Sequence, residues 1–128
     1  MTSNNLSVEA EHVLATANYP LRNRSLEKLT AFRNETRRSI TPAVERVLKM
    51  YEASIETRDI SGVTCLWVKP SRLKVDWKIF YGYGGGYVSG SPFEDLTIAV
   101  PLAAETGAEV LIPHYRLAPE SPWPAAID

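Results

Sequence analysis

The chain has 128 residues, enough for one domain with its own core, and at 45% hydrophobic and 23% charged residues it has the composition of an ordinary water-soluble protein. Its 14 basic and 15 acidic residues give a formal net charge of -1, which offers no electrostatic basis for binding nucleic acid or an anionic membrane. The single cysteine, Cys65, excludes an internal disulfide, and neither a signal peptide nor a membrane span is visible, so we expect a cytoplasmic protein.

Residues 1–52 are predicted to be helical. Ser7, Ser25 and Thr41 each precede a run of apolar residues at helical spacing, which predicts three helices. The first helix is expected to end before Pro20, whereas Pro42 takes the first position of the third. The apolar faces of the second and third helices are expected to carry Leu26, Leu29 and Phe32, and then Val44, Val47, Leu48 and Tyr51.

From residue 53 the pattern becomes extended. Residues 54–58 and 63–68 flank Ser61-Gly62 and predict a β-hairpin. Residues 77–81 predict a third strand, and residues 109–113 predict a buried fourth strand.

A helix is predicted between the last two strands. Ser91, Pro92 and Glu94 provide its cap, its first-position proline and the glutamate of a capping box, and Gly107 ends it. We expect a kink or break before the interior Pro101, and an apolar face of Leu96, Ala99, Val100 and Ala103. Strand, helix and strand form a βαβ unit with parallel strands and a right-handed crossover, which places the chain in the α/β class as a mixed sheet with the hairpin.

Three consecutive glycines, Gly84, Gly85 and Gly86, follow the strand over residues 77–81 after Gly82 and Tyr83. Ligands bind at the carboxyl ends of strands in open α/β sheets, and backbone N–H groups there can stabilise a negatively charged oxygen. The dinucleotide fingerprint fails because Tyr87 or Ser89 stands at the third glycine position, and no lysine completes a P-loop. A purely structural loop remains the alternative on these residues alone, and no spacing of ligands predicts a metal site.

Several motifs occur in a specific order: Tyr83 to Pro92, Leu102 to Gly107, Tyr115 to Glu120 and Pro122 to Ala126. Over residues 77–128 the chain thereby resembles the hormone-sensitive-lipase-like α/β-hydrolases, the fold-3 carboxylesterases. The resemblance implies an α/β-hydrolase core over residues 53–128 behind a helical cap segment over residues 1–52.

The same resemblance implies hydrolysis of small-molecule carboxylic esters of short to medium acyl chains, without a cofactor. Gly85 and Gly86 are expected to donate the oxyanion-hole N–H groups, Tyr83 to brace the loop, and Gly84 and Tyr87 to contact substrate. The chain departs from the family at Tyr83, which replaces a histidine. Gly82 likewise replaces a bulkier residue and His114 an aspartate.

A nucleophile elbow, G-x-S-x-G, is missing, because Gly86 to Gly90 places Ser89 one position late. The family's serine, acid and histidine would follow Asp128, so we expect this chain alone to be inactive. His12 and His114 are expected to be surface and structural residues, respectively. We expect a truncated core with a long unpaired apolar edge, ending in a helix that begins at residue 122. The alternatives are a receptor-like binder of small ligands and an inactive remnant; the oligomeric state is not predicted.

Overall fold

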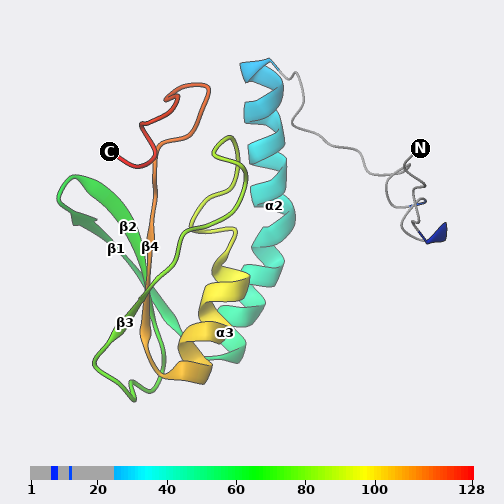
Figure 1. Cartoon of the computed structure of the whole chain (residues 1–128). Coiled ribbons are helices and arrows are strands. Elements are labelled where there is room, and N and C mark those ends of the chain that lie inside the picture. Colours follow the sequence, from blue (N-terminus) through cyan, green and yellow to red (C-terminus); the bar gives the residue numbers. More distant parts are fainter. Residues whose placement is uncertain (1–6, 9–11, 13–24) are drawn as a thin grey trace.

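The computed structural model describes residues 7, 8, 12 and 25–128 (Figure 1). The helix predicted after Ser7 therefore lies outside the described residues, apart from Ser7, Val8 and His12. In chain order the elements are α2 (Leu26–Met50), β1 (Ser54–Ile60), β2 (Val63–Lys69), β3 (Lys78–Phe80), α3 (Leu96–Thr106) and β4 (Glu109–Pro113).

The four strands form one mixed sheet in the order β1-β2-β4-β3. The predicted hairpin is confirmed: β1 pairs antiparallel with β2, and Ser61 and Gly62 both have the positive φ, 53° and 85°, that a tight two-residue turn needs. The predicted βαβ unit is confirmed as well, because β3 pairs parallel with β4 through α3. β4 also pairs antiparallel with β2, and so joins the hairpin to the βαβ unit.

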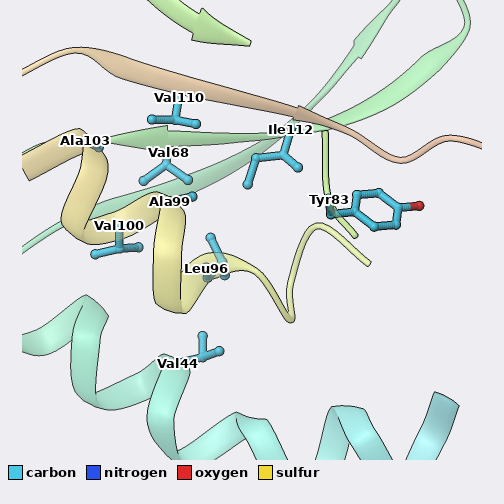
Figure 2. Packing of buried hydrophobic residues seen from close by; sticks show 9 residues of the cluster. All are labelled: Val44, Val68, Tyr83, Leu96, Ala99, Val100, Ala103, Val110 and Ile112. Carbon is cyan, nitrogen blue, oxygen red and sulfur yellow. The ribbon is translucent and has the colours of Figure 1, made fainter. Parts of the chain in front are cut away.

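The core lies on one face of the sheet. Helix α3 packs against β2 and β4 and also contacts α2, so side chains around most of its circumference are covered (Figure 1). This explains its sequence, which is apolar on every side apart from three threonine and glutamate residues. A cluster of buried side chains from α2, α3, β2, β4 and the segment after β3 forms the hydrophobic core (Figure 2): Val44, Val68, Tyr83, Leu96, Ala99, Val100, Ala103, Val110 and Ile112.

Helix α2 is one continuous helix of 25 residues, so the prediction of two helices separated at Thr41 is wrong. Ser25 caps it as predicted, accepting a hydrogen bond from the Lys28 N–H. Thr41 caps nothing, since its hydroxyl donates to the Arg37 carbonyl oxygen 2.7 Å away, inside the helix. Pro42 is exposed, and so is Arg38, whose carbonyl would have accepted the missing N–H; water can solvate that carbonyl instead.

Helix α3 begins at Leu96, later than the predicted start after Ser91. Ser91 instead closes a turn: its hydroxyl accepts from the Glu94 N–H at 3.4 Å and donates to the Glu94 carboxylate at 3.2 Å. The helix continues through Pro101, so the break that was one of the two expected outcomes does not occur, and Gly107 ends the helix with a φ of 70°, as predicted.

Two expectations about the end of the chain are also wrong. Residues 122–128 form turns, with the N–H groups of Ala125 and Ile127 donating to the carbonyls of Pro122 and Pro124. The edge strand β3 is only three residues long, so the free apolar edge is short, although Phe80 on it is 72% exposed. None of the helices in the described part of the chain is both long and apolar enough to cross a lipid bilayer.

Candidate functional site

The glycine loop, defined here as residues 82–91, leaves the carboxyl end of β3. The segment from His114 to Glu120 leaves the carboxyl end of the neighbouring parallel strand β4, so the two lie beside each other. An open groove of about 910 Å³ lies at this end of the sheet, lined in part by Phe80, Gly82, Tyr87, Leu111, His114 and Tyr115. The groove therefore occupies the position at which open α/β sheets bind ligands.

The loop backbone turns one carbonyl inward and leaves several N–H groups free. The Gly85 carbonyl oxygen accepts from the N–H groups of Val88 and Ser89 and from the Ser89 hydroxyl, at 3.2, 3.1 and 3.1 Å. The N–H groups of Gly84, Gly85, Gly86 and Tyr87 donate to no residue within the described ranges. These N–H groups are available to an oxygen of a ligand or to water.

Two glycines are required by close approach of the backbone to itself. A Cβ at Gly85, where φ is 123°, would lie 2.0 Å from the Ser89 carbonyl oxygen. A Cβ at Gly90, where φ is 87°, would lie 2.2 Å from the Gly84 carbonyl oxygen. Gly86 has free space around it, but its φ of 60° favours glycine. The loop thus folds tightly on itself, which fixes the direction of its N–H groups.

Tyr83 lies beneath the loop and is only 4% exposed. Its hydroxyl donates to the Tyr115 carbonyl oxygen at 3.1 Å, and the Tyr115 hydroxyl donates back to the Tyr83 carbonyl oxygen. The two rings stack with centroids 4.0 Å apart. Burial raises the pKa of both phenols, so both remain protonated donors at neutral pH. This reciprocal pair connects the start of the glycine loop to the segment after β4.

The remaining predicted site residues lie in two places. Tyr87 is 58% exposed and lines the groove, with its ring centroid 5.8 Å from that of Tyr115. Gly84 and Gly85 border a separate pocket of about 230 Å³, formed by the loop and by α2 residues including Phe32 and Thr36, and neither Gly85 nor Gly86 lines the groove. Sequence reasoning missed Tyr115, whose place beside Tyr83 is set only by the pairing of β3 with β4.

Ser89 and His114 are not joined as a nucleophile and base. The Ser89 hydroxyl is 3.1 Å from the Gly85 carbonyl oxygen, to which it donates, and the residue is 8% exposed. His114 is exposed, and its backbone N–H donates to the Thr64 carbonyl oxygen. Within the described ranges, no group of three or more histidine, cysteine, aspartate or glutamate side chains could hold a metal ion.

Comparison with known proteins identifies the fold. Residues 79–128 match the family model described as alpha/beta hydrolase fold. A hormone-sensitive lipase from a metagenome library superposes with a TM-score of 0.69 at 30% identity, over 91% of this chain and 36% of that one. Esterase E25 superposes with a TM-score of 0.72 over 90% of this chain and 38% of that one, and at 21% identity it shows the fold alone.

Two curated relatives are similar in sequence. An acetyl-hydrolase of Streptomyces hygroscopicus is 42% identical over 69 residues, which are 54% of this chain and 23% of the relative. An esterase of Gibberella moniliformis is 46% identical over 46 residues, which are 36% of this chain and 14% of the relative. The matched part of the chain therefore covers less than a quarter of the length of either protein. The matched residues, the mixed sheet and these similarities together show part of an α/β-hydrolase fold that is similar to hormone-sensitive-lipase-like esterases.

Proposed function

We propose that the glycine loop supplies the oxyanion-hole donors of a carboxylic ester hydrolase, and that the N–H groups of Gly85 and Gly86 are these donors. The observation that carries the proposal is that both N–H groups lack an acceptor in the described structure and lie beyond the carboxyl end of β3, in the loop whose residues Gly82 and Tyr87 line the open groove. The names of the two curated relatives, an acetyl-hydrolase and an esterase, agree with this chemistry.

The proposed chemistry is attack of a serine on an ester carbonyl, which places negative charge on the carbonyl oxygen. Fixed N–H groups stabilise that charge, and loss of one such donor typically costs about 2.7–4 kcal/mol of transition-state stabilisation. The Tyr83–Tyr115 pair and the internal bonds of the Gly85 carbonyl hold the donors in place. Because no fixed donor has to reorganise during the reaction, this rigidity favours catalysis.

The groove supports a small-molecule ester as substrate. Its lining includes Phe80, Leu111 and Pro113, which suit an acyl chain, and Tyr87 adds an exposed ring at the rim. We propose that the segment over residues 1–52 acts as a cap beside this site, on the basis that α2, its described helix, forms a common pocket with the glycine loop. The single buried cysteine, Cys65, supports a reducing compartment such as the cytoplasm.

This chain by itself is proposed to be inactive. Ser89 is buried and committed to the Gly85 carbonyl, and no hydrogen bond joins it to His114. The 128-residue chain should therefore hydrolyse p-nitrophenyl acetate no faster than its Ser89→Ala variant. Turnover by the purified chain that Ser89→Ala abolishes would contradict this part of the proposal.

The donors are tested in the complete product of the reading frame, assayed with p-nitrophenyl acetate and butyrate. Gly86→Ala places a methyl beside the proposed donor, and we expect kcat to fall by about 10²-fold. Gly62→Ala is the matched control, since it also adds a Cβ in free space at a positive φ, 85°, and it also lines the groove, but in the hairpin turn rather than in the glycine loop. We expect the control to lose comparable stability and far less of its kcat. A folded Gly86→Ala protein as active as Gly62→Ala would overturn the proposal.

A further inference from the structure

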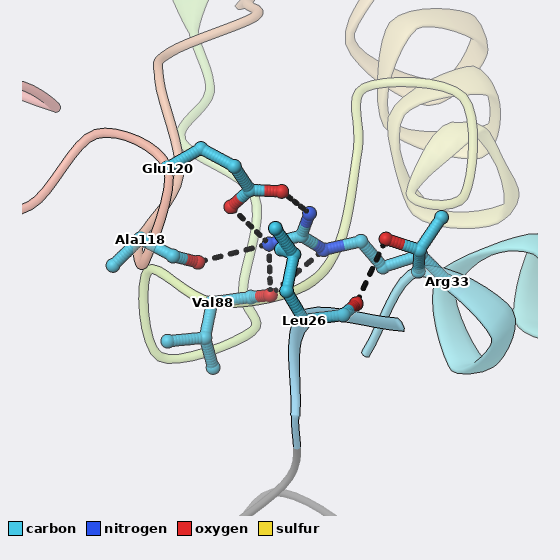
Figure 3. Close-up of polar contacts among 6 residues, drawn as sticks. Leu26, Arg33, Val88, Ala118 and Glu120 are labelled. Carbon is cyan, nitrogen blue, oxygen red and sulfur yellow. Dashed lines mark hydrogen bonds and ion pairs between the residues drawn. The ribbon is translucent and has the colours of Figure 1, made fainter. Parts of the chain in front are cut away.

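One arginine of α2 reaches two segments that are distant from it in sequence (Figure 3). The Arg33 guanidinium donates to the Val88 carbonyl oxygen through Nε and Nη2, at 3.0 and 2.8 Å. It also donates to the Ala118 carbonyl oxygen at 2.9 Å, and to both carboxylate oxygens of Glu120 at 2.6 and 3.2 Å. Arg33 thus joins α2, the glycine loop and the segment after β4.

The Val88 carbonyl lies where the loop most needs external support. The preceding residue, Tyr87, has a φ of 60°, which costs a residue other than glycine about 1–2 kcal/mol. Such a conformation persists only where its surroundings hold it. The Tyr87 carbonyl oxygen accepts from the Ala118 N–H at 2.8 Å, and the Val88 carbonyl accepts from Arg33. The loop is therefore held internally by the bonds to the Gly85 carbonyl, and externally by Ala118 at the Tyr87 carbonyl and by Arg33 at the Val88 carbonyl.

Arginine suits these contacts and lysine does not. Planar guanidinium groups present several donors in a fixed fork, whereas an ammonium group is a compact point charge. The Arg33 side chain is only 20% exposed, and the carboxylate of Glu120 faces it. This pairing lowers the pKa of Glu120, so the carboxylate stays ionised and fixes the plane of the guanidinium.

We propose that Arg33 is a positioning residue, which sets the conformation of the glycine loop from α2 by binding the Val88 and Ala118 carbonyls together. Its effect on catalysis rests on the proposed function, but its effect on the loop does not. Arg33 touches no reacting atom in this scheme and acts through the backbone of residues 85–89.

The test uses the complete product of the reading frame and compares Arg33→Met, Arg33→Lys and Glu120→Gln with a matched control, Arg38→Met. Arg38 lies on the same helix with a 77% exposed side chain, and among the residues that the structure describes its one ion pair is with Glu35 at 3.6 Å. Hydrogen–deuterium exchange is read separately for the two loop amides that donate to the Gly85 carbonyl, those of Val88 and Ser89, and for β4, residues 109–113. Steady-state kinetics with p-nitrophenyl butyrate supply kcat and KM.

We expect Arg33→Met to speed exchange in the loop by about tenfold or more while β4 is unchanged. Arg33→Lys should recover only part of the protection, and Glu120→Gln should have the smaller effect, since the carbonyl contacts remain. kcat should fall about tenfold in Arg33→Met, with KM changing less. Arg38→Met should leave the loop and the kinetics as they are.

Two results would overturn the proposal. One is loop exchange in Arg33→Met equal to that in Arg38→Met; the other is equal acceleration in the loop and in β4, which indicates a general loss of stability. A loop that responds as expected in a protein without esterase activity supports the positioning role and contradicts the proposed function instead. The two proposals are thereby separated.

Discussion

At the scale of single residues, the candidate site contains one residue whose backbone conformation is strained. Tyr87 adopts the left-handed conformation, with a φ of 60°, although it carries a Cβ and an aromatic ring. The residue is 58% exposed, it lines the groove, and its ring centroid lies 5.8 Å from that of Tyr115. The ring therefore contributes little burial to offset the backbone strain.

This strain predicts a difference between two substitutions. Tyr87→Ala removes the ring and keeps the strain, whereas Tyr87→Gly removes both. We expect Tyr87→Gly to be more stable than Tyr87→Ala by about 1 kcal/mol in the free energy of unfolding, measured with urea. Equal stabilities, or a more stable alanine variant, would show that the left-handed backbone is not strained at this position.

The sequence predicts the position of the loop but not what holds it. Gly84, Gly85 and Gly86 are visible as a run after a strand, and their place at the carboxyl end of β3 is confirmed. Tyr115 and Arg33 could not be predicted as loop partners, because both contacts span more than thirty positions in the chain. Such contacts depend on strand pairing and helix packing, which local patterns do not contain.

At the scale of elements, α2 shows where local signals fail. Thr41-Pro42 has the form of a cap followed by a first-position proline, yet the helix passes through both. Val44 is fully buried in the core, and Leu29 earlier on the same helix is 5% exposed. Tertiary packing along the whole helix therefore outweighs one lost hydrogen bond. At the end of α3, by contrast, the local signal is correct, since Gly107 terminates the helix where the sequence predicts.

The proline in α2 gives a prediction about stability. Pro42→Ala restores an N–H that can donate to the Arg38 carbonyl, at an exposed position where no packing is lost. An interior proline costs a helix about 3 kcal/mol, part of which is offset by a less flexible unfolded chain. We expect Pro42→Ala to raise the free energy of unfolding by about 1–2 kcal/mol in urea denaturation.

Glu45→Ala, also exposed on α2, is the control for this measurement and should change stability by less than about 0.5 kcal/mol. A destabilised Pro42→Ala protein would show instead that the geometry imposed by the proline is needed for the packing of Val44 and its neighbours.

At the scale of the whole molecule, the two faces of the sheet differ in chemistry. The face toward α3 is apolar, whereas the opposite face carries ion pairs across the strands. Glu56 accepts from Arg58 and contacts Lys69, at 2.9 and 2.5 Å, and Lys78 pairs with Glu109 at 2.9 Å. Arg58 also lies over the Trp67 ring, 4.3 Å from its centroid. These charges make the stability of the sheet depend on pH.

We expect Glu56 to cause a loss of folding stability at acid pH. Its hydrogen bonds to Arg58 and then to Lys69 lower its pKa from 4.5 to about 2. A lowered pKa in the folded state means that the stabilisation is complete above the unfolded pKa and is lost as the pH falls toward 2. We expect the urea midpoint to fall between about pH 5 and pH 2, and Glu56→Gln to flatten this fall. The control, Glu45→Gln on α2, should leave the fall of the urea midpoint with pH unchanged. A fall that is equally steep in Glu56→Gln would contradict the role given to Glu56.

We expect the Tyr83–Tyr115 pair beneath the glycine loop to cause a loss of folding stability at alkaline pH. Burial raises the pKa of Tyr83, and a raised pKa in the folded state means that this stabilisation is complete below the unfolded value of about 10 and is lost at higher pH. Tyr83→Phe removes the bond to the Tyr115 carbonyl, so we expect it to lower stability at neutral pH by about 1 kcal/mol and to make the loss above pH 10 shallower. Tyr87→Phe, at an exposed ring, is the control. Urea midpoints across pH 8 to 11 measure both effects. If the Tyr83→Phe protein loses as much stability above pH 10 as the unmodified protein does, the loss has a cause other than the Tyr83–Tyr115 pair.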